Sequence, residues 1–331
     1  MLRRPALAFA ALVTVGGLGG LATPVRAEPP GELRVVSSVD SAIIVGAMAA
    51  SLVPMTIPLR SPVLWDNQLL GEADRTAYDQ LSRPAARLSD LALLVALTAP
   101  AVYLTGSTID DAVGDRLVLY GETLAIDLAL VQLAKYLVHR PRPYLYNHSA
   151  DAAGLAAASG DDAWRSFYSS HAAMSFGAAV AGAYLLSETG ARPAARAAAW
   201  AGGFALAAAT SNLRVRAGMH FYSDVIIGGV VGAAVGYAVP ALHARGERYA
   251  PRGADLAAAG AGLLAGTALG ELVPLGKPGR ASAVMVDHVH VGPLALRDGG
   301  GVAISGRVRS RWGRMPLSRG SAATPRAAGA E

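Results

Sequence analysis

The sequence predicts an all-α fold, a bundle of about six apolar helices embedded in a membrane or associated with one. Three features of the composition support this prediction. Hydrophobic residues make up 53% of the 331 residues, and the mean hydropathy of +0.36 is high for a soluble domain. Charged residues make up only 16%, against about a quarter in ordinary globular proteins. Glycine, with 38 residues, and alanine dominate the apolar stretches, which suits helices that pack closely through small side chains.

Residues 1–27 have the pattern of a secretory signal peptide. Arg3 and Arg4 form a basic start, residues 6–22 are apolar, and Val25-Arg26-Ala27 resembles a small-x-small cleavage site. We expect this segment to be removed. An uncleaved first membrane helix is the alternative.

The helical part of the chain is expected in seven apolar segments. The six stronger segments cover residues 41–59, 91–106, 117–138, 172–187, 197–210 and 225–242, and a weaker one covers residues 256–270. Most are shorter than the roughly 20 residues of a spanning helix, so short spans and buried helices of a soluble bundle both remain open. Two acidic residues of the third segment, Glu122 and Asp127, are expected to be paired inside the bundle.

The C-terminal region has a different pattern. After three glycines, Val302, Ile304 and Val308 alternate in part with small or polar residues, which predicts a short strand over residues 299–310. Beyond Met315 the chain is basic and rich in small residues, as in disordered tails. We therefore expect a helical domain over residues 28–245 and a C-terminal extension over residues 246–331.

Composition also excludes some functions. The chain has no cysteine, which excludes disulfides, thiolate metal sites and cysteine nucleophiles. No basic run is interleaved with aromatic residues, so no nucleic-acid partner is expected.

Three clusters of polar residues lie at ends of apolar segments. The first contains Lys135 and Arg142, two cations that can converge on one anion where Pro141 and Pro143 end a helix. By itself, such a cluster is more often an interfacial anchor.

The second cluster is Ser166-Phe-Tyr-Ser169-Ser170-His171, at the start of the fourth segment. A serine before an apolar run is a good N-cap, and the free N–H groups of a helix start bind anions. By itself, this cluster is more simply an N-cap beside an incidental histidine.

The third cluster contains Arg214, His220 and Asp224. The i, i+4 spacing of His220 and Asp224 puts them on one helix face, where the carboxylate can accept an N–H from the ring and leave the other nitrogen free as a nucleophile.

Together the clusters read Lys-x6-Arg-Pro, then Ser-x-His, then Arg-x5-His-x3-Asp. This order and spacing resemble the signature of the type 2 phosphatidic acid phosphatase and vanadium haloperoxidase superfamily, over about residues 117–242. The resemblance implies a phosphatase in which His220 attacks phosphorus, Asp224 orients His220, and His171 protonates the leaving oxygen and then activates water. The phosphoryl oxygens would be bound by Lys135, Arg142, Ser169, Ser170 and Arg214. We expect no metal or other cofactor, because the cations can carry the transition-state charge.

The sequence departs from the family pattern in three places. Tyr168-Ser169-Ser170-His171 stands where the family commonly has Pro-Ser-Gly-His, and Leu213 replaces a serine. These changes affect supporting residues and bear on rate and substrate preference more than on reaction class.

Other candidates receive simpler interpretations. His288 and His290 could lie on one face of a strand, but two ligands without a third are more often surface histidines. Asp161 and Asp162 are expected in a solvated loop. The alternatives to a phosphatase are a vanadate-dependent haloperoxidase and a non-enzymatic envelope protein of the same fold.

The expected substrate is a phosphorylated lipid, an isoprenoid diphosphate or a small phosphate ester, with the lipid-like ones favoured by the apolar bundle. We expect a bacterial envelope protein, in the membrane or periplasm and in contact with lipid, with its active site on the periplasmic side. A cleaved signal followed by six spans would instead put the three clusters on the cytoplasmic side. Loop charges conflict as well, because Arg245, Arg248 and Arg252 indicate a cytoplasmic end while the loop 107–115 on the same side has three aspartates.

Overall fold

The computed structural model describes residues 32–59, 62–66, 70–107, 112–273, 284–296 and 299–310. The chain divides into two compact units, Met1–Gly276 and Lys277–Glu331. The signal peptide expected at residues 1–27 and the basic tail expected after Met315 lie outside the described residues.

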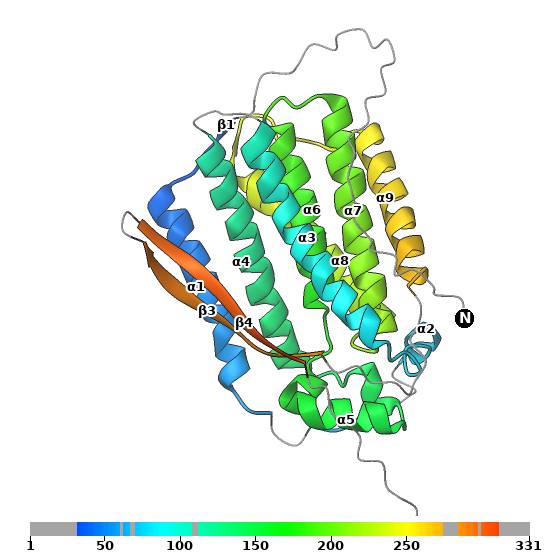
Figure 1. The fold of residues 1–331 in the computed structure, drawn as a ribbon. Coiled ribbons are helices and arrows are strands. Elements are labelled where there is room, and N and C mark those ends of the chain that lie inside the picture. The colour runs from blue at the N-terminus through cyan, green and yellow to red at the C-terminus, as the bar shows by residue number, and fades with distance from the viewer. Residues whose placement is uncertain are drawn as a thin grey trace, which may run out of the picture. The chain divides into compact units, whose positions relative to one another are not determined.

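The first unit is a helical bundle, which confirms the predicted all-α fold (Figure 1). Its long helices are α1 (Ser37–Thr56), α3 (Arg83–Ser107), α4 (Val113–Val138), α6 (Ser170–Ser187), α7 (Pro193–Arg216), α8 (Tyr222–His243) and α9 (Gly253–Glu271). The shorter elements are α2 (Glu72–Arg75), α5 (Ala150–Ser159), the 3-10 helices η2 (Pro143–Tyr146) and η3 (Gly160–Trp164), and the paired strands β1 (Glu32–Leu33) and β2 (Ala244–Arg245). Most of the predicted apolar segments lie wholly within one helix, and the helices extend beyond them.

Local sequence explains where the helices next to the clusters start and stop. The Ser169 side chain accepts a hydrogen bond from Ala172 N and caps the start of α6. Helix α4 ends at His139, whose left-handed φ of 49° terminates the helix just before Pro141. These two helix ends fix the positions of the first two clusters.

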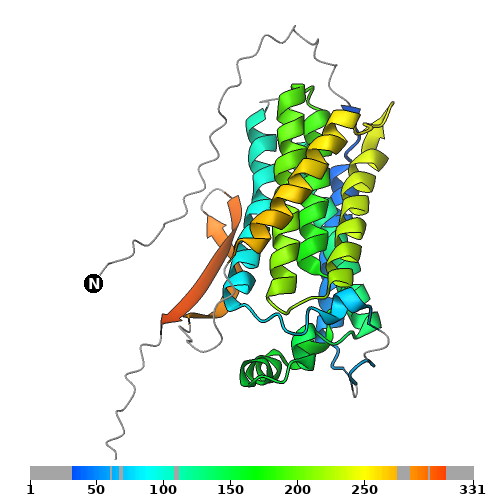
Figure 2. The same ribbon diagram turned by 90° about the vertical axis from the view of Figure 1, so that its right-hand side faces the viewer.

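Helix α6 lies in the middle of the bundle and contacts α3, α4, α7 and α8, while α1 packs on α4 and α9 packs on α7 (Figures 1 and 2). Small residues allow the closest contacts. A Cβ atom added at Gly232 of α8 would lie 2.0 Å from the carbonyl oxygen of Ala173 in α6. Glycines at helical spacing make the same approach to a backbone carbonyl along α8 and along α9, namely Gly228, Gly232, Gly236, Gly262 and Gly266. The abundance of glycine thus reflects close helix packing.

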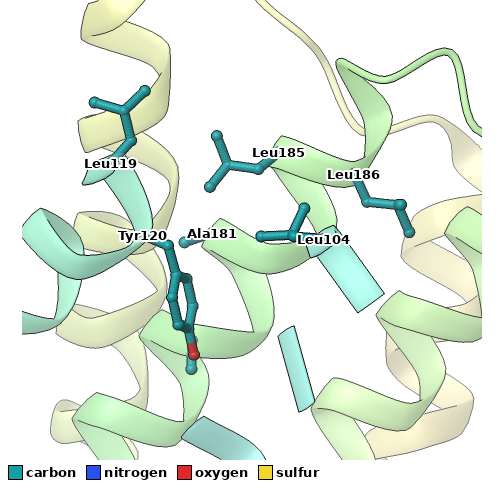
Figure 3. Close-up of a cluster of buried hydrophobic side chains, with 7 residues drawn as sticks. Leu104, Leu119, Tyr120, Ala181, Leu185 and Leu186 are labelled. Atoms are coloured by element: carbon teal, nitrogen blue, oxygen red, sulfur yellow. The ribbon is translucent and has the colours of Figure 1, made fainter. Parts of the chain in front are cut away.

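Larger apolar side chains fill one part of the bundle between α3, α4 and α6 (Figure 3). Leu104, Leu119 and Leu185 are fully buried there, where their side chains make van der Waals contacts between the helices. The Tyr120 hydroxyl donates to the Leu97 carbonyl over 2.7 Å. This cluster holds the three helices at a fixed spacing.

The outer surface of the bundle is apolar. Five of the described helices, α1, α3, α4, α8 and α9, are long and apolar enough to cross a membrane. Their outward residues include Val45, Leu137, Ile226 and Leu264, each more than 60% exposed. Soluble monomers rarely expose apolar surface on this scale, so these helices indicate a membrane protein.

Asp127 was expected to be paired inside the bundle, but the structure shows no partner for it among the described residues. It is fully buried in α4, and neither carboxylate oxygen has a hydrogen-bond partner among the described residues. A Cβ atom at Gly177 would lie 2.0 Å from its Oδ2 atom, so the glycine makes room for the acid. Glu122, by contrast, lies near His243.

The second unit contains the antiparallel strands β3 (Val284–Leu296) and β4 (Gly299–Ser310). The strand predicted over residues 299–310 is therefore present. Its partner β3 includes His288 and His290, for which a strand had been considered but not its pairing with residues 299–310. The expected domain boundary at residue 245 does not divide the structure, because α9 packs along α7 within the first unit.

Candidate active site

The structure brings the three predicted clusters to one end of the bundle, the end near α2 and α5 in Figure 1. Helices α4 and α7 end there, and α6 and α8 begin there. Alternating helix directions bring these ends together, as expected for an up-and-down bundle. A short turn joins α7 to α8, whereas a longer segment that contains α5 joins α4 to α6.

His220 and Asp224 lie at the start of α8 and are both completely buried. The Nδ1 atom of His220 lies 3.6 Å from Oδ2 of Asp224, slightly beyond hydrogen-bond range. The opposite ring nitrogen, Nε2, lies 3.4 Å from a guanidinium nitrogen of Arg142. The ring thus has one nitrogen toward a carboxylate and the other toward a cation. Such contacts are often long before substrate binds.

Asp224 is held by three donors besides facing His220. Arg140 donates to its Oδ1 atom over 2.6 Å, while the Ser166 hydroxyl and the Phe221 N–H donate to Oδ2 over 2.5 and 2.9 Å. Charge-assisted contacts of this length fix the orientation of the carboxylate. Asp224 can therefore present a negative charge to His220 from a rigid position.

Arg140 is itself built into the fold. It donates to Asp74 over 2.8 Å and to the Ser223 hydroxyl over 2.7 Å, and its guanidinium lies 4.2 Å from the centre of the Phe221 ring. Asp74 in turn accepts from the N–H and hydroxyl of Ser223. This network ties α2 and the loop after α4 to the start of α8.

Arg142 lies on the other side of His220. Its Nε atom and one terminal nitrogen donate to the backbone oxygen and the carboxylate of Asp162, each over 2.8 Å, and its other terminal nitrogen donates to the Met219 carbonyl over 2.9 Å. Asp162 was expected in a solvated loop. It lies in η3 instead, and although its side chain is 59% exposed, it is paired with Arg142.

Nearby cations lower the pKa values of both Asp162 and His220. Burial acts to raise the pKa of Asp162, but Arg142 and Lys135 lower it below its usual value. Burial holds the pKa of His220 well below 6.5, and Arg142, Arg214 and Lys135 add to this effect. All three predicted phosphate-binding cations therefore act on the His220 ring, which is neutral at neutral pH.

His171 and Arg214 meet at a carboxylate on α3. Asp90 Oδ1 lies 2.9 Å from Nε2 of His171 and 3.4 Å from a guanidinium nitrogen of Arg214. Arg214 is also within 3.4 Å of the Ser89 hydroxyl. The Nδ1 atom of His171 is buried and has no hydrogen-bond partner among the described residues. His171 thus has one nitrogen held by a carboxylate and one available for proton transfer.

The start of α6 supplies further donors. Ser169 is fully buried and caps the helix, while its N–H donates to the Asp224 carbonyl over 3.1 Å. Ser170 is the first residue of α6, and the first N–H groups of a helix have no partner within it. Ser170 does not have a positive φ, so its conformation does not require glycine.

The turn before His220 does require glycine. Gly218 has a φ of 72°, and a Cβ atom there would lie 2.2 Å from the Gln80 carbonyl oxygen. This turn lets the chain reverse between Arg214 at the end of α7 and His220 before α8.

Sequence reasoning missed the residues that support the predicted ones. Asp90 and Asp74 lie on α3 and α2, outside any motif, and nothing in their spacing pointed to the site. Arg140 and Ser166 lie inside the first two clusters, and both contact Asp224. Their closeness in sequence to the predicted site residues was the only feature that could have indicated a role for them.

The arrangement combines a neutral histidine, a second histidine and three cations without a nearby excess of negative charge. It can therefore bind a phosphoryl group and transfer it to nitrogen.

Comparison with known proteins identifies a family for the part of the chain that contains the site. The profile of the PAP2 superfamily matches residues 116–248, the region that contains all three clusters. No curated protein and no solved structure matches the chain. Residues 116–248 belong to the PAP2 superfamily, the type 2 phosphatidic acid phosphatases, which supports phosphoester hydrolysis at the level of that superfamily.

Proposed function

We propose that the protein is a membrane phosphatase that hydrolyses phosphate esters through a phosphohistidine at His220. The observation that carries the proposal is the position of His220, with Nδ1 toward Asp224 and Nε2 toward Arg142. A neutral imidazole surrounded by cations is suited to attack a phosphoryl group that those cations bind.

In the first step, the Nε2 lone pair of His220 forms a bond to phosphorus and the bond between phosphorus and the ester oxygen breaks. His171 gives a proton to that oxygen, and the alcohol leaves. Asp224 then faces the positively charged phosphoimidazole across 3.6 Å. Lys135, Arg142 and Arg214, with the Ser169 hydroxyl and the Ser170 N–H, hold the phosphoryl oxygens.

In the second step, His171 takes a proton from a water molecule whose oxygen attacks phosphorus. The nitrogen–phosphorus bond breaks, inorganic phosphate leaves, and His220 regains its lone pair. Asp90 positions His171 for both proton transfers.

We favour a substrate with a phosphorylated head and an apolar chain. Leu130, Leu133 and Leu137 are exposed on the outer face of α4, within about 8 Å along the helix axis of the buried Lys135. Ile226, 61% exposed, follows Asp224 by two residues. A lipid phosphate in the bilayer could place its head at the cations while its chain stays beside these residues.

The sidedness of the site depends on α1. This helix runs from Ser37 at the opposite end of the bundle to the site end, so residues before Ser37 and the active site lie on opposite sides if α1 spans. We propose a periplasmic site, which puts Arg245, Arg248 and Arg252 in the cytoplasm. The start of α1 at Ser37 then lies on the cytoplasmic side, which is incompatible with a signal peptide cleaved after residue 27. Because the chain lacks cysteine, single cysteines at residues 161 and 191 would report each side by labelling of intact cells.

Hydrolysis of a chromogenic phosphate ester tests the activity. His220→Ala should abolish turnover, whereas His148→Ala, at an exposed histidine, should leave turnover unchanged. Orthovanadate should inhibit competitively, and a chelator should leave kcat unchanged below the unfolding temperature. Full activity of a folded His220→Ala protein would refute the proposal. Halide oxidation by the vanadate-loaded protein would favour the haloperoxidase alternative.

A further inference from the structure

A second cluster of ionisable residues lies at the opposite end of the bundle from the active site. Asp40 in the first turn of α1, Glu122 in α4 and His243 at the end of α8 each offer one ligand atom, and these atoms all lie within 4.8 Å of one another. Glu122 and Lys135 are 13 residues apart on α4, a rise of about 20 Å, so this cluster is separate from the catalytic residues.

The three side chains are oriented toward a common point. The Nε2 atom of His243 lies 3.4 Å from Oδ1 of Asp40 and 3.9 Å from Oε2 of Glu122. The other oxygen of Asp40 accepts from Val36 N over 2.7 Å, which leaves Oδ1 for the cluster.

The hydrogen bond on the far side of His243 selects its tautomer. Nδ1 lies 2.8 Å from the carbonyl oxygen of Val239, an acceptor, so Nδ1 carries the proton. In the neutral ring, Nε2 then has its lone pair directed at two carboxylates. A backbone carbonyl behind Nδ1 is the usual support of a metal-binding histidine.

The environment of Glu122 independently favours a cation at this cluster. Its side chain is 4% exposed, and Oε2 is buried without a hydrogen-bond partner in the part of the chain that the structure describes. Asp40 is buried as well. Two buried carboxylates this close repel each other, and a protonated His243 would balance only one negative charge. A divalent cation with neutral His243 balances both.

We propose that Asp40, Glu122 and His243 bind a divalent transition-metal ion. One imidazole nitrogen and two carboxylate oxygens match zinc best, because magnesium and calcium prefer oxygen ligands alone. The separations of 3.4 and 3.9 Å need to change little around an ion with ligand distances of about 2.0–2.2 Å.

The ion would fasten α1 to the bundle. Helix α1 has few buried residues, and its C-terminal end is held by Arg165, which donates to the Pro54 and Ile57 carbonyls. The metal joins the N-terminal turn of α1 to α4 and α8. It acts on stability and leaves the chemistry at His220 unchanged.

Metal analysis of the full-length protein, purified without a histidine tag and stripped with a chelator, tests the site. After zinc addition and gel filtration, the wild-type protein should retain one zinc per chain, and Glu122→Gln should weaken binding by a hundredfold or more. Glu188→Gln makes the same change at another buried glutamate, in the C-cap of α6, and should retain the ion. The double variant His288→Gln/His290→Gln should retain it too.

Two measurements on the wild-type protein remain decisive if Glu122→Gln fails to fold. X-ray absorption of the zinc protein should show one imidazole among nitrogen and oxygen ligands at about 2.0–2.1 Å. Hydrogen exchange should slow in α1 when zinc is added to the stripped protein. Absence of zinc binding by the wild-type protein, zinc bound by several imidazoles, or full zinc retention by folded Glu122→Gln would overturn the proposal.

Discussion

Replacing Asp224 by asparagine removes one negative charge while keeping the size of the side chain. The asparagine oxygen can still accept from Arg140 or Ser166, so the packing around α8 should be largely kept. What is lost is the charge 3.6 Å from Nδ1 of His220. Because His220 is neutral before attack and positive once phosphorylated, this loss acts mainly on the transition state and the intermediate.

The expected magnitude follows from that distance. Two unit charges 3.6 Å apart interact by about 4–5 kcal/mol at an effective dielectric constant of about 20. Loss of that interaction corresponds to a decrease in kcat of roughly a thousandfold or more. KM should change little, since phosphate binding depends on the cations.

Asp74→Asn provides the matched control. Asp74 also pairs with Arg140, over 2.8 Å, but it contacts Ser223 and does not face His220. Steady-state hydrolysis of a chromogenic ester, with melting temperatures in detergent, would compare the two variants. Asp74→Asn should keep kcat within roughly tenfold of the wild type. The reasoning would be refuted if folded Asp224→Asn also kept kcat within tenfold, or if both variants lost activity equally.

Three further predictions concern the phosphate-binding side of the site. Ser170→Gly should retain kcat, because the N–H donates whatever the side chain and the backbone there does not need glycine; a hundredfold loss in a stable variant, the effect of about 2.7–4 kcal/mol expected for one lost donor, would assign the contact to the hydroxyl. Asp162→Asn should lower the inhibition constant of orthovanadate severalfold, because the carboxylate competes for Arg142 while its backbone oxygen still holds the Nε atom; an unchanged or higher constant would show that the charge of Asp162 does not compete. Burial, and then the nearby cations, lower the pKa of His220, so His220 becomes protonated only well below pH 6.5. We therefore expect that protonation of His220 causes no decrease in kcat/KM near pH 6.5. A decrease centred at pH 6.5 whose midpoint shifts when Arg142 is replaced by glutamine would contradict the lowered pKa of His220.

Residues close in sequence were predictable, whereas contacts between distant helices were not. The apolar segments located the helices, and Pro141, Pro143 and Ser169 marked the ends at which the clusters lie. The order of the clusters along alternating helices was enough to bring them to one end of the bundle.

The supporting carboxylates could not be found in this way. Asp90 meets His171 from 81 residues away, and Asp74 meets Arg140 from 66 residues away. Neither has a neighbour in sequence that marks it. Asp127 shows the opposite problem, because a buried acid was expected to be paired, and the room for it comes from Gly177 on another helix. Such contacts depend on how each helix is rotated about its axis. The hydrophobic pattern does not define this rotation here, because alanine and glycine give little contrast between the buried and exposed faces.

The central claim is that His220 carries the phosphoryl group between the two steps. Its most direct test uses an aryl phosphate, whose leaving group departs without a proton, and the His171→Ala variant, which lacks the base for the second step. After an alkaline quench, mass spectrometry should find phosphate on the peptide that contains His220, and none there in the His171→Ala/His220→Ala double variant. Phosphate on another residue, or turnover of the aryl ester with no phosphorylated intermediate in any variant, would contradict the account.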